Sequence, residues 1–298
     1  MSHQASTQNE WTIHALNIHG VFFERKCATT VAAAPGWRIV STNYPVEYPP
    51  PNGPWRGKES SVDIWARKDI DEGQVLDVLI ECKKANPEFV NWVFFPKHEG
   101  TPPVPFRFSR AINEINPAGS APWTSKHVLQ RGSTTMPVAS DAREVRGDYV
   151  KHQGNNKTKT SNASIQDAAY QVALAHRAIV QEDSALIERA RQSGQHANPP
   201  WQTKAYVPLI VTTARLYRVD FAPAATDLRT GEIDLKTAAL VPVENLLYEY
   251  PLPKHLQHSP QDSLAALKGS DTEAFSRMDI LVVQAESLTA FLATLFTQ

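Results

Sequence analysis

Three charged residues stand inside apolar, β-prone runs of the sequence: Asp63 in SSVDIWARK, and Glu81 and Lys83 in QVLDVLIECKK. Burying a charge without a partner is costly, so their positions require an explanation. Two neighbouring carboxylates repel unless a cation lies between them, and their oxygens suit a hard divalent cation such as Mg²⁺ or Mn²⁺. A nearby lysine could hold a water molecule and stabilise negative charge that develops in a reaction.

The two runs have the pattern of a β-hairpin, because the separating DIDEG is typical of a turn. A turn centred on Glu72 places Asp63 across from Glu81, with Cβ atoms roughly 5 Å apart. Side-chain alternation puts Lys83 on the same face. The other face is expected to carry Val62, Ile64, Val78, Ile80 and Cys82. The alternative is an ordinary ion pair between Lys83 and one of the acids on a solvated sheet face.

Helices and strands alternate around this hairpin, which indicates an α/β fold with a mixed sheet. Predicted helices cover 9–34 and 164–194, and predicted strands cover 37–46, 60–68, 74–84, 205–221 (one long strand or a pair) and 238–253; a strand, turn and terminal helix cover 279–296.

Residues 96–163 are rich in Pro, Ser, Thr, Asn and Gly and show little periodicity. We expect a long insertion there without regular structure, which is either a lid, a binding insertion or a partly disordered segment. The predicted domain is a core at 1–222 that contains this insertion. Residues 223–298 are expected to add C-terminal strands and a helix to the same domain.

The residues of the hairpin resemble the PD-(D/E)xK nuclease superfamily, which has the restriction-endonuclease-like fold. VDIWA, with Asp63, and LIECKK, with Glu81-x-Lys83, carry the resemblance, together with the order helix, three strands, helix, strand. Val62 replaces the proline of the motif. The resemblance implies that Asp63 and Glu81 bind Mg²⁺ (or Mn²⁺) and that Lys83 positions the attacking water.

The same resemblance suggests three further catalytic residues. Members often carry another acid on the first helix, where Glu24 stands in GVFFERK. Exonuclease-type members carry Gln-x-x-x-Tyr on the helix after the core strands, which QDAAY matches with Gln166 and Tyr170. Residues four apart share one face of a helix. The alternatives are a surface charge for Glu24 and a core aromatic for Tyr170.

A local basic excess in the insertion favours a nucleic-acid partner, because phosphate backbones bind cationic patches without reading sequence. The cations of the insertion include Arg107, Arg110, Lys126, Arg131, Arg143, Arg146, Lys151 and Lys157. The residues that we expect to contact nucleic acid are Lys84, Arg143, Arg146, Lys151, Lys157 and Lys159. The alternative is a solvated loop whose charges keep the protein soluble.

Composition limits the other possibilities. The net charge of the chain is −1, so the overall charge does not indicate a nucleic-acid partner. The two cysteines, Cys27 and Cys82, form neither a disulfide framework nor a zinc motif, which favours a reducing compartment. The sequence has no signal-like start, no apolar run of membrane-spanning length and no Gly-rich phosphate loop. We expect a cytoplasmic protein without a membrane partner.

The expected function is metal-dependent hydrolysis of phosphodiester bonds in DNA, with RNA as the less favoured substrate. Because no reader domain or motor is recognisable, a homo-oligomer or a partner protein is expected to control the activity. A nuclease core that lacks its own reader domain and motor suggests the effector of a restriction or antiviral defence system. The alternative is a non-catalytic nucleic-acid-binding or assembly subunit that retains the nuclease fold.

Overall fold

The computed structural model of the chain describes residues 2–46, 60–115, 123–145, 160–161, 163–193, 201–234, 236–257 and 276–295. The α-helices are α1 (Ser2–Ile18), α2 (Val21–Ala33), α3 (Ala163–Ser193) and α5 (Leu288–Thr294). Strands of the first half are β1 (Trp37–Val46), β2 (Ser60–Asp71), β3 (Gln74–Lys83), β4 (Asn91–Phe95), β5 (Val104–Ile115), β6 (Trp123–Met136), β7 (Val138–Ala139) and β8 (Asp141–Val145). They are followed by β9 (Thr160–Ser161), β10 (Thr203–Thr212), β11 (Arg215–Phe221), β12 (Ala238–Val243), β13 (Asn245–Pro251) and β14 (Arg277–Gln284).

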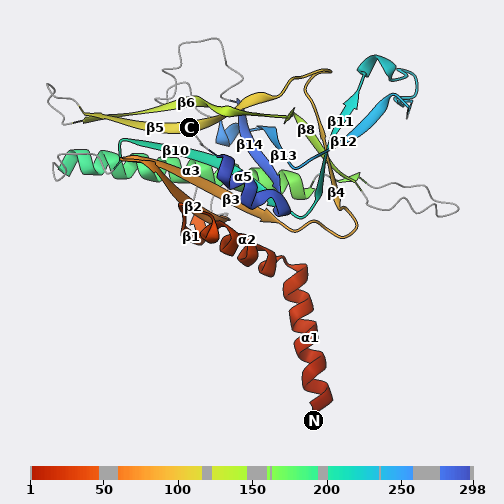
Figure 1. The fold of residues 1–298 in the computed structure, drawn as a ribbon, viewed down its shortest axis with the longest axis horizontal. Coiled ribbons are helices and arrows are strands. Elements are labelled where there is room, and N and C mark those ends of the chain that lie inside the picture. The colour runs from red at the N-terminus through yellow and green to blue at the C-terminus, as the bar shows by residue number, and fades with distance from the viewer. Residues whose placement is uncertain are drawn as a thin grey trace.

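A mixed sheet forms the centre of the molecule, as the sequence predicts (Figure 1). Its strand order is β1-β2-β3-β10-β14-β13-β7, and β5 joins β10 and carries β6. The first three strands are antiparallel, and β10 runs parallel to β3. The predicted hairpin register is confirmed, since Ile64 pairs with Ile80 and Ala66 with Val78.

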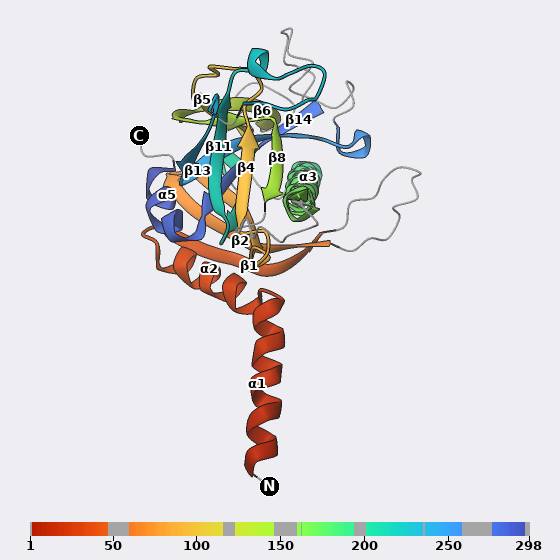
Figure 2. The same ribbon diagram turned by 90° about the vertical axis from the view of Figure 1, so that its right-hand side faces the viewer.

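Helices cover both faces of this sheet (Figure 2). The apolar stripe of α3, including Ile165, Val172 and Ile179, packs against Leu79 and Ile210 of the sheet. On the other face, α2 and α5 pack together with sheet residues. That cluster contains Cys27, Val31, Ile64, Val78, Ile80, Cys82, Leu288, Phe291 and Leu292. Val62 is the exception to the predicted alternation, because it belongs to the α3 cluster.

The expectation of an irregular insertion at 96–163 is wrong for its described residues. They contain the long hairpin of β5 and β6, together with β7, β8 and β9. β5 pairs with the edge of β10, while β8 and β9 join β4, β11 and β12 in a second sheet of five strands. The hairpin strands carry many polar residues, which resemble a loop in composition, and the pairings with β10 and β4 leave little local signal because these partners are distant in sequence.

The N-terminal helix is divided in two, which corrects the continuous helix predicted at 9–34. Gly20 has a φ of 80°, in the left-handed region that glycine adopts without strain, and it ends one helix and begins the next. In both views α1 projects away from the rest of the molecule (Figures 1 and 2). None of the described helices is long and apolar enough to cross a membrane.

Of the C-terminal strands, β13 and β14 complete the central sheet, whereas β12 joins the second sheet. β14 runs parallel to β10 at Leu209–Thr212, and β13 pairs antiparallel with β14. The strand, turn and helix predicted at 279–296 are confirmed as β14, a short 3₁₀ turn at Ala285–Ser287 and α5.

Candidate functional site

Asp63, Glu81 and Lys83 meet where β2 begins and β3 ends. Extending the β2–β3 register by one residue from Ile64–Ile80 places Asp63 across from Glu81. Asp63 Oδ2 accepts a hydrogen bond of 2.7 Å from the backbone N–H of Cys82. Lys83 Nζ lies 2.8 Å from Glu81 Oε1. The ion pair that the sequence left as an alternative is therefore present between Lys83 and Glu81.

Glu81 is the most deeply buried of these charged groups, with 3% of its side chain exposed. Burial raises the pKa of Glu81 to about 8, and the charge of Asp63 acts in the same direction while Lys83 opposes both. Its second oxygen, Oε2, is buried and has no hydrogen-bond partner. Burial also raises the pKa of Asp63, against the Cys82 hydrogen bond and the charge of Lys83. The site therefore holds more carboxylate than its cations neutralise.

Glu24 of α2 interacts electrostatically with Asp63 and Lys83. Burial and the charge of Asp63 raise the pKa of Glu24, while Lys83 lowers it. Gly20 begins α2 by accepting the backbone N–H of Glu24 at 3.0 Å. A Cβ on Gly20 would lie 3.8 Å from Glu24 Oε1 and 3.7 Å from Lys84 Cβ, so the helix junction adjoins the site.

A cavity of about 270 Å³ opens beside these acids, between α2 and strands β1 and β2. Glu24 and Asp63 both line it, with Arg25 as the cation of the wall. The Asp63 side chain therefore faces residues of α2 as well as Glu81. It is not confined to the sheet face that it was predicted to share with Glu81 and Lys83. Arg25 was not predicted as a site residue, although it directly follows Glu24 in the sequence.

The structure places Gln166 and Tyr170 apart from the acids. Gln166 Nε2 donates to Tyr248 Oη at 2.9 Å, and Tyr170 Oη lies 3.2 Å from His255 Nε2. Gln171 of the same helix reaches the site instead, with its Oε1 2.8 Å from Lys83 Nζ. The Gln-x-x-x-Tyr spacing indicates a shared helix face, but it does not specify which turn of α3 lies over the end of β3.

The described residues of the expected nucleic-acid interface have partners within the chain. Lys84 Nζ donates to the backbone O of Asn17 at 2.5 Å and to its Oδ1 at 3.0 Å. Arg143 pairs with Asp141 and donates to Ala142 O at 2.8 Å. The other four expected contacts, Arg146, Lys151, Lys157 and Lys159, lie outside the described residues.

The donor set suits a hard cation, since the acids present only oxygen ligands and Glu81 Oε2 is a buried acceptor without a partner. Within the described part of the chain, no three His, Cys, Asp or Glu side chains are already arranged at metal-binding distances. Asp63 and Glu81 are the residues that would hold such a cation, with Glu24 next to them.

Comparison of the chain with family models, curated proteins and solved structures found no match. The function of the chain is therefore inferred from the candidate site and from the order of the elements that build it.

Proposed function

We propose that the protein is a metal-dependent nuclease that hydrolyses phosphodiester bonds, with DNA as the preferred substrate. The observation that carries this proposal is the meeting of Asp63 and Glu81 beside Lys83 at the end of β3, with Glu24 and Asp63 on the wall of one adjoining cavity. Further support comes from the order α2, β1, β2, β3 and then, after the inserted strands β4 to β9, α3 and β10, with β10 parallel to β3; this order resembles that of the restriction-endonuclease-like core.

Each residue of the group has a role that its position supports. Asp63 and Glu81 would hold a divalent cation, which supplies Lewis-acid activation of the phosphate and of a nucleophilic water. The Lys83 ammonium, directed by Glu81 and Gln171, offers a donor for the water and for the negative charge that develops on phosphate. Glu24 can accept a hydrogen bond from water on the α2 side.

The test is cleavage of supercoiled plasmid and of labelled DNA and RNA oligonucleotides with Mg²⁺, with Mn²⁺ and with EDTA. We expect cleavage only with metal, and a rate loss of about 100-fold or more in Glu81→Gln and Lys83→Gln, because both remove charge at the reacting centre. Faster cutting of RNA than of DNA would revise the substrate.

Glu88→Gln is the matched control, because Glu88 is an exposed carboxylate in the loop that follows β3. Its rate should equal that of the wild type. Cleavage that survives unchanged in Glu81→Gln and Lys83→Gln would rule out this site. If wild-type protein leaves every substrate intact under all metal conditions, including with an added partner, the nuclease proposal fails.

The Lys83–Glu81 ion pair favours a second candidate, a non-catalytic nucleic-acid-binding or assembly subunit with this fold, because the pair partly neutralises the site without a metal. That candidate predicts DNA binding that is indifferent to metal and to Glu81. Thermal stabilisation by Mg²⁺ that is lost in Asp63→Ala would contradict it. Control by a partner protein, as in an antiviral defence system, is compatible with either candidate.

A further inference from the structure

Asn43 is the one non-glycine residue with a left-handed backbone among the described residues, with a φ of 51°. It lies in β1, where an extended backbone is the rule, two residues after a register shift between Ile39 and Ser41. Asparagine tolerates this conformation better than most residues, but glycine adopts it with less strain. The backbone alone therefore does not account for a side chain at this position.

The position of Asn43 relative to the candidate site supplies a reason. Thr42 pairs with Ile64 and Tyr44 pairs with Val62, so Asn43 stands directly across from Asp63 in the β1–β2 ladder. Both residues line the cavity of about 270 Å³. The left-handed turn of the backbone thus brings a carboxamide to the wall that also carries Asp63 and Glu24.

The cavity wall combines three kinds of chemistry. The acids Glu24 and Asp63 occupy part of it, Arg25 contributes a cation, and Thr29, Thr42 and Asn43 add neutral hydrogen-bonding groups. Val21, Ala28 and Ile64 add apolar surface. A ligand that fits this combination has an anionic group, several hydrogen-bonding atoms and an apolar face, as a nucleotide does.

We propose that this cavity holds a single nucleotide of the strand to be cut, with the Asn43 carboxamide hydrogen-bonded to the nucleotide and the Arg25 guanidinium bound to its phosphate. The inference rests on the proposed nuclease function for the orientation of the ligand, because a phosphate next to Asp63 and Glu24 requires a cation between them. Arginine presents a planar fork of donors that matches phosphate oxygens.

The experiment measures binding rather than cutting, with Ca²⁺ in place of Mg²⁺. A fluorescein-labelled single strand of twelve thymidines is titrated with protein and followed by anisotropy, and thymidine 5′-monophosphate is then added as competitor. We expect the monophosphate to displace the strand. In Asn43→Gly the dissociation constants of both ligands should rise about tenfold, which corresponds to about 1.4 kcal/mol. Arg25→Gln should have a similar effect.

Asn43→Gly separates a ligand-binding role from a structural one, because glycine keeps the left-handed backbone and should leave the melting temperature unchanged or higher. Asn43→Asp keeps the shape but adds a third carboxylate, so it should weaken binding further. Arg38→Gln is the matched control for Arg25→Gln, since Arg38 is an exposed arginine of β1 outside the cavity lining, and its affinity should stay within about twofold of the wild type.

Two outcomes overturn the inference: wild-type protein that binds neither ligand, or equal affinities in wild type and Asn43→Gly. Failure of the nuclease proposal is distinguishable from both. If the protein binds the monophosphate through Asn43 but cuts nothing, the nucleotide pocket is supported and the nuclease function fails. If Asn43→Gly cuts DNA with the same KM as the wild type, the nuclease function is supported and the nucleotide pocket fails.

Discussion

The folded chain favours the protonated form of the Glu81 carboxyl group more than the unfolded chain does. Burial first, and then the charge of Asp63, raise the pKa of Glu81 from 4.5 to about 8. A proton that the folded state retains and the unfolded state releases links stability to pH. Glu81 therefore contributes stability that is fully present below about pH 4.5, and this contribution is lost as the pH rises through about 8.

In metal-free protein, the melting temperature of the wild type should therefore decrease, relative to that of Glu81→Gln, as the pH is raised from about 5 to about 8. Glutamine resembles the protonated acid, so the variant lacks this dependence, and the two curves should diverge by several °C at the alkaline end. Differential scanning calorimetry with EDTA measures both. Parallel curves would mean that Glu81 is ionised and paired with Lys83 over the whole range.

At the level of residues, the acids were predictable from sequence and Asn43 was not. The pairing of Asp63 with Glu81 follows from one short turn and from side-chain alternation, which are local properties. The left-handed backbone of Asn43 arises where β1 bends against β2, and no sequence pattern marks it. Gln171 was not predicted either, because its contact with Lys83 depends on the position of α3 along the sheet.

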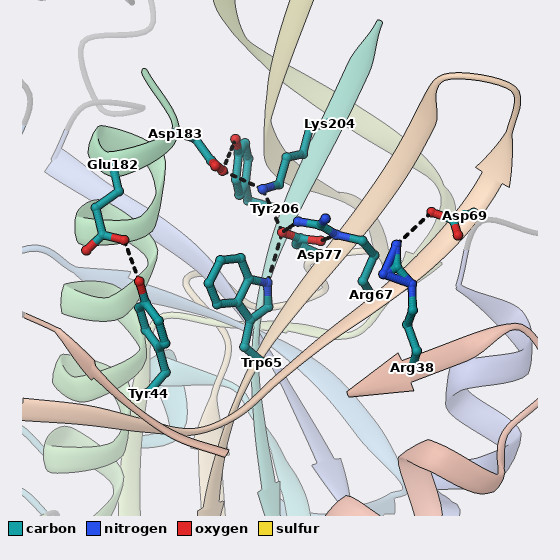
Figure 3. A network of polar contacts seen from close by, with 10 residues as sticks. All are labelled: Arg38, Tyr44, Trp65, Arg67, Asp69, Asp77, Glu182, Asp183, Lys204 and Tyr206. Atoms are coloured by element: carbon teal, nitrogen blue, oxygen red, sulfur yellow. Dashed lines mark hydrogen bonds and ion pairs between the residues drawn. The ribbon is translucent and has the colours of Figure 1, made fainter. Parts of the chain in front are cut away.

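A buried charge network fastens α3 to the central sheet at the beginning of β3 and β10 (Figure 3). Lys204 of β10 is 1% exposed, and its Nζ lies 2.9 Å from Asp77 Oδ2 of β3 and 2.5 Å from Asp183 Oδ2 of α3. Arg67 and Trp65 also donate to Asp77. Burial alone would raise the pKa of Asp77, but the Arg67 hydrogen bond and the charge of Lys204 outweigh it and lower that pKa.

Replacing Lys204 with methionine should destabilise the protein by about 3 kcal/mol or more, because two carboxylates remain buried without their shared cation. Urea unfolding of the wild type and of Lys204→Met measures the difference. Arg38→Met is the control, since its ion pair with Asp69 is exposed, with 51% and 63% of the two side chains accessible. The control should change stability by less than about 1 kcal/mol. Equal effects would show that burial of the network contributes nothing.

At the level of elements, strands of apolar composition were predictable, and strands of polar composition were not. β1, β2 and β3 form consecutive antiparallel pairs, and their apolar content marks each of them. β5 and β6 also form an antiparallel hairpin of sequence neighbours, but their polar composition hides it. β5 then pairs through four residues with Thr203–Tyr206 of β10, about ninety residues later.

The whole molecule consists of a folded body and a helix that projects from it (Figure 1). On α1, 73% of Trp11 and 63% of Ile18 are exposed, so this helix buries little apolar surface. Its C-terminal end is held by the hydrogen bonds from Lys84 to Asn17. Short isolated helices are marginally stable in water, which means that α1 gains little from the body and contributes little to it.

Deleting residues 1–18 should therefore leave the melting temperature of the body within about 2 °C of the full chain, because the apolar area lost from the folded state is small. Phe291→Ala on α5 is the contrasting control: this ring is 4% exposed in the cluster with Cys27 and Val31, and its removal should cost about 3–5 kcal/mol. A large fall on deletion would mean that α1 is packed in solution. If that fall depends on protein concentration, the packing is against a second copy of the chain rather than against its own body.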